Sequence, residues 1–457
     1  MSPCRCCSRI PPVAGLAVLL VGCTAPHPTG TPLTAPSLPP PAVEHTAAKS
    51  AEATPPVPVP DVLTLADALL LAVQGNPALA ASARDVQAAE ARMRQAALPP
   101  NPELEVEIDE VDRDGAGFDS AETAIVIGQT FELGGKRGWR RRVARAESEL
   151  AAWDYASKRL DLCAETARRF HEVLAAQGRL ELARAAQELA EQTNRAVAER
   201  VKAGKEPPLQ VAKSQAEREL ARLDAAEAEA TLASARRQLA ACWGASAAAF
   251  ARVQGDLNTM AATVPPLEVL RSSLMRNPDL ARWETAGRLQ RAALAEARAG
   301  RIPDLHGSVG FVQYKEDGTE ALAFRVGLPL PLFDRNQGNI AAAAHDLDRT
   351  EDERRAATLA LNGSLAEAHA ALASAHQRVV ALRDMVLPAM ERTYQAAREG
   401  YEQGTFGLLD VLDAQRILGE TQVALLEAQS GYHRAVVEIQ RLTAGGMDAF
   451  TKEWMED

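Results

Sequence analysis

Aromatic residues are scarce in this 457-residue chain, at 4% of the sequence, although hydrophobic residues make up 47%. Much of that hydrophobic content is alanine, which buries little area, whereas aromatic side chains usually dominate the energetics of a globular core. The scarcity argues against bulky conventional cores, even though the length would accommodate about two or three ordinary domains. Long helices that pack through small side chains fit this composition better.

The sequence also has no excess of basic residues. It contains 50 Lys and Arg and 61 Asp and Glu, which gives a formal net charge of −11. Nucleic-acid binding needs clustered Lys and Arg to face the phosphates, so no nucleic-acid partner is expected. The sequence also lacks a nucleophile–base set, a phosphate-binding loop and a metal-ligand cluster. We therefore expect no enzyme activity, no cofactor and no resident metal ion.

The N-terminus resembles a lipoprotein signal peptide over residues 1–22. Two arginines precede a short apolar run, residues 13–21, which is too short to span a bilayer as a helix. The run ends in the sequence LVGC, which resembles a bacterial lipobox in which Cys23 would be acylated. An Asp directly after the acylated cysteine would change the membrane to which the lipoprotein is sorted. Thr24 occupies this position, so the resemblance implies sorting to the outer membrane. The alternative is an ordinary signal peptide that is cleaved nearby, with Cys23 incidental.

Cleavage would remove the two arginines and leave a mature net charge of −11 − 2 = −13. Besides Cys23, the mature chain would keep only Cys163 and Cys242, which make no disulfide framework and are expected to pack between helices. Residues 23–60 are rich in Pro, Thr, Ala and Ser and predict a semi-extended tether between lipid and body.

The rest of the chain is duplicated. Three anchor sequences recur at an offset of 200 or 201 residues: NPAL at 76–79 as NPDL at 277–280, NPEL at 101–104 as IPDL at 302–305, and KAG at 202–204 as EQG at 402–404. Several anchors at one offset indicate a two-fold internal repeat, unlike a solenoid of short units. We expect the repeats at 61–258 and 259–446, with a C-terminal tail at 447–457.

Each repeat is predicted to contain an opening helix, two strands and a hairpin of long helices. The opening helices span 64–97 and 267–299, and the strands, in which apolar residues alternate, span 103–109, 124–131, 308–314 and 321–328. The hairpins combine 139–201 with 209–243, and 340–400, interrupted only by Pro388, with 408–443. Gly204 and Gly404 mark the hairpin tips. At 1.5 Å per residue, the first arms would reach roughly 90 Å, as in a coiled coil or a helical tunnel.

Four strands are too few to close a membrane barrel on their own. Their lengths are near the 9–11 residues that a tilted strand needs to span a bilayer. Only closed barrels satisfy strand backbones in lipid, and the smallest have eight strands. Either the strands form a small soluble sheet, or several chains share a barrel of eight, twelve or sixteen strands. The lipobox and the alternating apolar residues favour sharing.

Together, these features resemble the TolC family of outer-membrane efflux channels over residues 63–446. Two sequences, IGQTFELGGKR at 127–137 and LPLPLFDRNQG at 328–338, resemble its cobalt–zinc–cadmium branch. The resemblance implies a mainly α fold with a small β part, in a homotrimer with a twelve-stranded barrel and a helical periplasmic tunnel. It also implies an outer-membrane location in a Gram-negative bacterium, and docking to a periplasmic adaptor and an inner-membrane RND pump. The chain would be a passive exit duct for cations of cobalt, zinc and cadmium, or of copper and silver.

The resemblance also carries a periplasmic gate to the start of the helix at 408–443. Asp410 and Asp413 lie three residues apart on one helix face, and in a trimer they would form two acidic rings where family residues narrow the aperture. The alternative is ordinary placement of Asp in a first helical turn. Tyr401 matches a family aromatic whose hydrogen bonds help to latch the aperture. Phe406 departs from the arginine of the multidrug prototype.

Two further residue groups could form a site. Glu103, Glu105 and Glu107 share one strand face and are predicted to line a lumen, with a merely solvated face as the alternative. His369 and His376 lie seven apart on a long helix, where solvated histidines are expected in preference to a metal site.

The remaining histidines, which include His171 and His433, are isolated in the sequence. Two other functions stay open. The same channel could serve multidrug efflux or type I protein secretion, because cargo choice would lie largely in the pump. The chain could instead be a periplasmic coiled-coil adaptor or scaffold, although an adaptor should have one hairpin between small β-domains.

Overall fold

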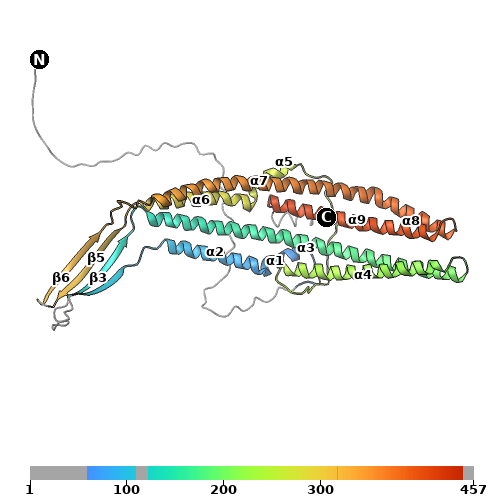
Figure 1. Cartoon of the computed structure of the whole chain (residues 1–457), viewed down its shortest axis with the longest axis horizontal. Coiled ribbons are helices and arrows are strands. Elements are labelled where there is room, and N and C mark those ends of the chain that lie inside the picture. The colour runs from blue at the N-terminus through green and yellow to red at the C-terminus, as the bar shows by residue number, and fades with distance from the viewer. Residues whose placement is uncertain (1–58, 110–121, 316, 446–457) are drawn as a thin grey trace, which may run out of the picture. The chain divides into compact units, whose positions relative to one another are not determined.

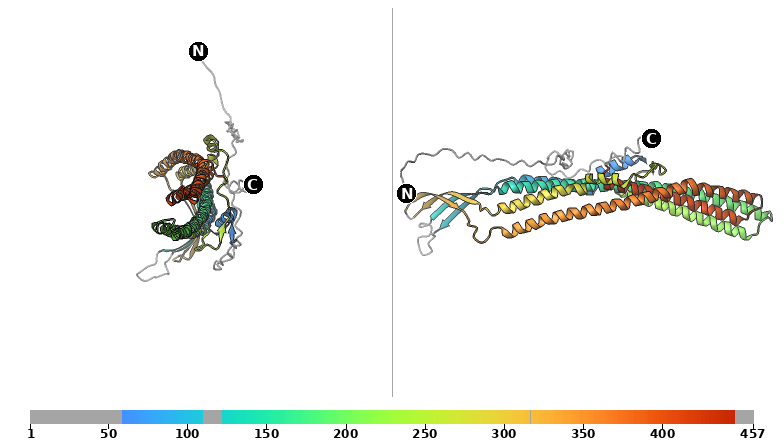
Figure 2. Two further views of the ribbon diagram at one scale, coloured as in Figure 1. Left: turned by 90° about the vertical axis from the view of Figure 1, so that its right-hand side faces the viewer. Right: turned by 90° about the horizontal axis from the view of Figure 1, so that it is seen from above.

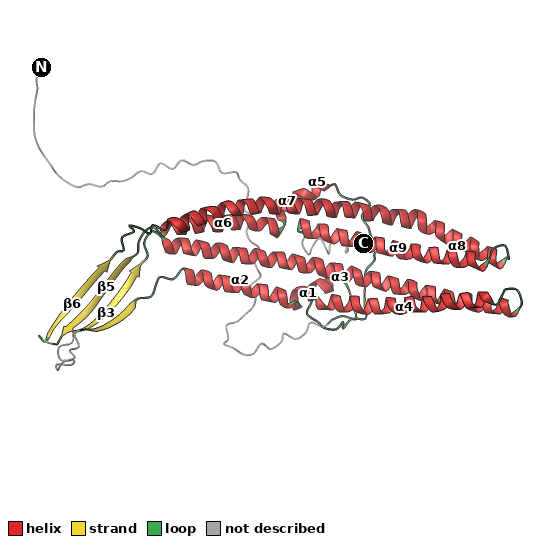
Figure 3. Ribbon diagram, viewed as in Figure 1, coloured by secondary structure: helices red, strands yellow, loops and turns green. Residues whose placement is uncertain are grey.

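The computed structural model describes residues 59–109, 122–315 and 317–445, which lie in one compact unit. The predicted signal peptide, Cys23, nearly all of the tether and the tail at 447–457 lie outside these residues. Among the described residues, helices dominate, and the strands of a four-stranded sheet gather beyond one end of them (Figure 1, Figure 3). No described helix combines the length and hydropathy needed to cross a bilayer.

The elements follow the duplicated order. The first repeat consists of β1 (Val62–Leu63), α1 (Leu65–Gly75), α2 (Pro77–Ala96), β2 (Glu103–Asp109), β3 (Glu122–Phe131), α3 (Lys136–Lys202), α4 (Leu209–Ala241) and β4 (Arg252–Val253). The second consists of α5 (Leu267–Ser273), a 3₁₀ turn (Leu274–Arg276), α6 (Pro278–Ala299), β5 (Leu305–Tyr314), β6 (Thr319–Gly327), α7 (Gln337–Ala381), a π-helical turn (Leu382–Val386), α8 (Leu387–Glu402) and α9 (Leu408–Thr443). The predicted strands and long helices are confirmed, with ends that differ by at most three residues.

The opening helices are broken, so the prediction of one continuous helix in each repeat was wrong. Asn76 and Asn277 each precede a proline, which lacks an N–H and disfavours a helical residue before it. Each Asn is extended, and its side-chain oxygen caps the helix that follows. The Asn76 amide also donates to the Cys242 carbonyl at 2.8 Å, and the Asn277 amide donates to the Leu442 carbonyl at 2.9 Å. In each repeat, an asparagine between the opening helices therefore binds the end of the last long helix.

Two antiparallel hairpins make up the helical part, α3 with α4, and α7 and α8 with α9. The views in Figure 1 and Figure 2 agree that these hairpins run side by side. α3 has 67 residues and therefore extends over roughly 100 Å. Its counterpart continues from α7 into α8 through the π-helical turn. Pro388 follows this turn, at a position where the missing N–H does not end the helix.

Small side chains allow the helices to pack closely. Ala164 and Ala167 of α3 are fully buried in a cluster with Leu69 of α1 and Val437 of α9. Larger clusters contain most of the bulky core, and their best-buried members are Leu63, Val173 and Leu239 in the first repeat and Leu365, Val379 and Leu442 in the second. Cys163 and Cys242 are buried free thiols, as predicted, and burial raises the pKa of both. The alanine content thus reflects contacts between helices.

The long strands form one antiparallel sheet in the order β2-β3-β5-β6. Since β3 pairs with β5, the sheet joins the two repeats, and β2 and β6 form its edges. The register places exposed apolar side chains on one face: Leu104, Val106, Ile108, Ile125, Ile127, Val309, Phe311, Leu322, Phe324 and Val326. The opposite face carries Glu103, Glu105, Glu107 and Arg325. So large an exposed apolar face is a surface that another phase or chain has to cover.

Candidate functional site at the hairpin turns

The two hairpins end in turns of the same geometry. Gly204 has φ = +73° and Gly404 has φ = +79°, which is the left-handed conformation that ends a helix. The N–H of Gly204 donates to the Val201 carbonyl at 2.9 Å, and the N–H of Gly404 donates to the Tyr401 carbonyl at 3.1 Å. No atom lies near enough to crowd a Cβ at either glycine, so the backbone angle selects Gly. The structure therefore places both glycines at the tips.

Asp410 and Asp413 start α9 directly after the second turn. The Asp410 carboxylate accepts a hydrogen bond from the Gly407 N–H at 2.8 Å and so caps the helix. The Asp413 carboxylate pairs with Arg416 at 2.7 Å, and the same guanidinium binds Glu420 at 2.7 Å. Sequence reasoning missed Arg416, although its spacing from both acids is typical of helix ion pairs. From its start to Glu420, α9 therefore exposes three acids and one base.

Tyr401 connects the two hairpins. The Arg200 guanidinium of α3 lies 4.4 Å from the centre of the Tyr401 ring on α8, and Glu206, after the first turn, lies 3.6 Å from Arg200. Burial raises the pKa of the Tyr401 hydroxyl, and Glu206 raises it further while Arg200 lowers it. The contact that the structure shows is a cation over an aromatic face. Arg200 and Glu206 were missed because they are distant from Tyr401 in sequence.

Phe406 occupies the position at which the sequence departs from the family pattern. Its ring packs directly over Gly400 on α8, where a Cβ would clash with the ring. The Thr405 and Phe406 N–H groups also donate to the Gly400 carbonyl, at 2.8 and 3.2 Å. The Phe406 side chain therefore packs within the second turn. Unlike an arginine, it cannot form an ion pair with the first hairpin.

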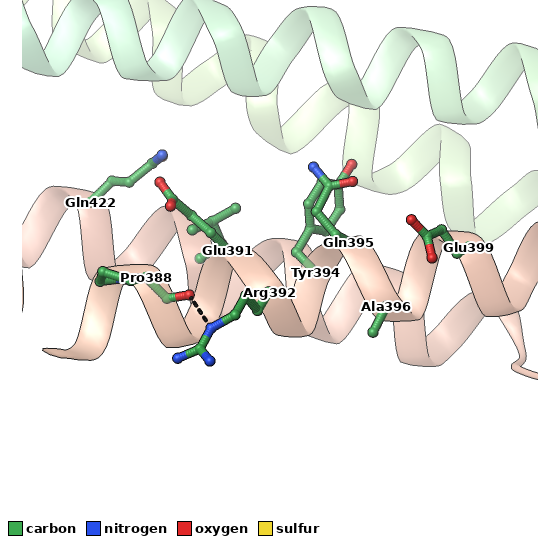
Figure 4. Close-up of a pocket in the computed structure, with 9 residues that line it drawn as sticks. Pro388, Glu391, Arg392, Tyr394, Gln395, Ala396, Glu399 and Gln422 are labelled. Carbon is green, nitrogen blue, oxygen red and sulfur yellow. Dashed lines mark hydrogen bonds between the residues drawn. The ribbon is translucent and has the colours of Figure 1, made fainter.

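A groove of about 760 Å³ runs along α8 and α9 above the second turn. Figure 4 shows Glu391, Gln395 and Glu399 pointing to one side of α8, while Arg392 points to the other side and donates to the Pro388 carbonyl. Sites for small organic ligands are mostly enclosed and apolar. This groove is instead an open, acidic surface of the hairpin.

Three histidines contact the segment between β4 and α5. Their Nε2 atoms lie near backbone carbonyl oxygens: His433 near Leu257 at 3.1 Å, His376 near Ala261 at 3.1 Å and His369 near Pro265 at 2.9 Å. The expectation of merely solvated histidines at 369 and 376 was therefore wrong. The described residues contain no group of three or more potential metal ligands.

His171 and His433, which are isolated in the sequence, form a stacked pair in the structure. Their ring centroids are 4.8 Å apart, with an interplanar angle of 7°. Burial, together with the neighbouring His433 ring, lowers the pKa of His171 to about 3. Burial also lowers the pKa of His433. The pair is therefore neutral at ordinary pH and joins α3 of one repeat to α9 of the other.

Comparison with known proteins agrees with this architecture. The chain is 35% identical to the cobalt-zinc-cadmium resistance protein CzcC of Cupriavidus metallidurans, over 83% of this chain and 90% of CzcC. It is 30% identical to the nickel and cobalt resistance protein CnrC of the same organism, over 58% of this chain and 63% of CnrC. A crystal structure of CusC superposes with a TM-score of 0.72 at 19% identity, over 84% of this chain and 92% of that one.

These findings confirm the predicted resemblance and fold class, and they confirm an efflux channel component that is not an enzyme. The model of the family described as outer membrane efflux protein matches residues 68–245 and 269–445. These two matches correspond to the two repeats. The chain therefore belongs to the outer membrane efflux protein family.

Proposed function

We propose that three copies of this chain form an outer-membrane exit duct for heavy-metal cations. The sheet carries this proposal, because its exposed apolar face and two open edges suit a wall segment of a lipid-embedded barrel. One chain supplies four strands, and the smallest membrane barrels need about eight. Three copies supply 3 × 4 = 12, and pairing β6 of one copy with β2 of the next closes the ring.

Metal cations are the cargo that the charges and the relatives support. Glu105 and Glu107 lie on the sheet face that would line the lumen, where rings of acid attract cations. The names of CzcC and CnrC refer to resistance to cobalt, zinc, cadmium and nickel. The chain conducts passively, while an inner-membrane RND pump supplies the energy and a periplasmic adaptor joins the pump to the hairpin tips.

Deletion of the gene should sensitise the host to divalent metals. We expect growth to fail at lower zinc, cobalt or cadmium concentrations, with the native chain restoring tolerance and forming detergent-extracted outer-membrane trimers. A panel of organic drugs serves as the control. Drug sensitivity with unchanged metal tolerance would favour multidrug efflux, and a monomer in the soluble periplasmic fraction would favour the adaptor or scaffold.

The second hairpin turn is the proposed gate. In a trimer, Asp410 and Asp413 would form rings at the inner end of the tunnel, with Arg416 offsetting part of their charge. The contact between Tyr401 and Arg200 would hold the gating hairpin against its neighbour. This contact takes the place of the latch hydrogen bonds that the family resemblance implies.

Arg200→Ala should therefore favour the open gate. A cation–π contact contributes about 0.5–1 kcal/mol, so three copies would contribute about 1.5–3 kcal/mol, equivalent to about a 10- to 150-fold shift toward open channels. Single-channel recording of purified trimers in planar bilayers measures this shift. Arg195→Ala is a matched control, because Arg195 pairs with Glu191 within α3. Equal open probabilities in the two variants would remove Arg200 from the latch.

Lipid attachment at Cys23 is proposed from the lipobox resemblance. Cys23→Ser should abolish incorporation of radiolabelled palmitate, since the acceptor thiol is gone. Cys163→Ser serves as the control and should label normally, because that thiol is buried. Palmitate incorporation that persists in Cys23→Ser would place the acyl group elsewhere.

A further inference from the structure

A defined contact closes the seam between the two repeats within the chain. The Leu133 N–H and the Lys136 ammonium both reach the Asp304 carboxylate, at 3.0 and 2.8 Å. Gly134 lies so close to Ile302 that an added Cβ would approach its Cδ1 at 2.8 Å. The segment that follows β3 therefore packs on the segment that precedes β5, and an ion pair fixes the contact.

The duplication places equivalent segments at the open edges of the sheet. Residues 328–336 follow β6 as residues 132–135 follow β3, and both stretches end in a left-handed residue before a long helix. Residues 98–102 precede β2 as residues 300–304 precede β5, and Glu103, the first residue of β2, occupies the position of Asp304 in the repeat. Because β2 and β6 are opposite edges, the equivalent contact cannot form within one chain.

The segment after β6 exposes large apolar side chains. Leu332 is 64% exposed and Phe333 is 91% exposed, the highest value among the large hydrophobic residues described. The segment before β2 offers Leu98, which is 53% exposed. Among the described residues, no ion pair involves Arg335 or Glu103. The segment after β6 thus presents apolar side chains and the adjacent charges of Asp334 and Arg335, and the segment before β2 presents Leu98 beside Glu103. The Asp334 carboxylate accepts a hydrogen bond from the Asn336 N–H at 2.8 Å, so Arg335 is the cation that can face Glu103.

We propose that residues 328–335 of one copy dock on residues 98–103 of the next copy, and that Arg335 pairs with the partner's Glu103. This inference rests on the trimer in the proposed function. β6 ends and β2 begins at the helical end of the sheet (Figure 1). Antiparallel pairing of these edges between copies therefore brings the two segments together, as the pairing of β3 with β5 does within the chain.

The seam between copies then repeats the seam within each copy. Lys136 corresponds to Gln337 in the repeat, so Arg335 supplies the cation from a position two residues earlier. Phe333 and Leu332 cover the partner's Leu98. Glu103 serves this seam, which leaves Glu105 and Glu107 on the lumen face. The apolar contact excludes water and shields the ion pair. Together the two contacts fix the register between neighbouring copies and contribute to their affinity.

Cross-linking tests the docking directly. The variant Glu103→Cys with Arg335→Cys, purified as full-length trimers and oxidised, should run as disulfide-linked dimers and trimers on denaturing gels. The matched control is Lys136→Cys with Asp304→Cys, which should form its disulfide within one chain and run as a monomer. Single-cysteine variants should also run as monomers, because Cys163 and Cys242 are buried.

A charge exchange tests the ion pair. Arg335→Glu and Glu103→Arg should each lower the temperature at which the trimer dissociates, because like charges then meet at three seams. The double variant should recover most of the loss, which a role of either residue in lining the lumen would not produce.

Two outcomes would overturn the docking while leaving the channel intact. Trimers that show neither cross-links nor charge rescue would exclude the contact. Full reaction of Phe333→Cys with a lipid-soluble maleimide, within an intact trimer, would show that lipid covers the segment. Absence of trimers in the unmodified protein would instead contradict the proposed function itself.

Discussion

Phe324→Arg should prevent the chain from accumulating as a trimer in the outer membrane. Phe324 is 76% exposed and stands between Leu322 and Val326 on the apolar face of β6. An Arg on the lipid face of a membrane strand costs about 2–4 kcal/mol near the midplane. The trimer repeats the substitution three times, so the cost is about 6–12 kcal/mol per assembly. Outer-membrane fractionation and heat-resistant bands on denaturing gels measure the result.

Ala323→Arg is the matched control for this prediction. Ala323 is adjacent in β6 but lies on the opposite face, where Arg325 is already present. A new Arg on that face meets water in the lumen and should leave the trimer level close to that of the unmodified chain. If both variants assemble equally well, lipid does not cover the apolar face and the barrel proposal fails.

Acidification should destabilise the helical part through the stacked histidines. The pKa of His171 is about 3 in the folded chain, against about 6.5 for an unfolded histidine. Because the folded pKa is lowered, the unfolded chain binds the extra proton, and stability falls as pH drops from 6.5 toward 3. The loss between pH 7.5 and pH 5 should be about 2 kcal/mol for His171 alone. Denaturant unfolding of detergent-solubilised protein, followed by circular dichroism, measures it.

His171→Gln should flatten this pH dependence, since glutamine does not titrate in the range. Removal of the ring stack also lowers the stability of this variant at pH 7.5. The informative quantity is therefore the difference in unfolding free energy between pH 7.5 and pH 5, and not the stability at either pH. His345→Gln, at an exposed site on α7, should retain the full difference. An unchanged difference in His171→Gln would assign the acid sensitivity to other groups.

Features governed by local periodicity were predictable from the sequence. Alternation placed Leu104, Val106 and Ile108 on one sheet face, and glycine at 204 and 404 marked turns that require a positive φ. The breaks at Asn76 and Asn277 could also have been predicted, because a following proline excludes a helical residue there. The same Asn-Pro pair marks the repeat and ends a helix.

Contacts between distant residues were not predictable in this way. The stack of His171 on His433 and the position of Arg200 over Tyr401 depend on how the two hairpins pack, which no single helix encodes. Asp410 shows a different difficulty. Its place in the first turn fits both a helix cap and an acidic ring, and the capping bond to Gly407 does not exclude the ring.

Because β3 pairs with β5, the two repeats of one chain are neighbours in the sheet. Their fusion in one chain has a genetic consequence. Six identical half-length chains would carry the same side chain at all six equivalent positions of a ring. Fusing two halves into one gene removes that constraint, because each half then mutates independently. This chain has used that freedom, with Asp410 and Asp413 in one half and Gln210 and Lys213 in the other. In the proposed trimer, selection can therefore tune alternate positions of one ring separately.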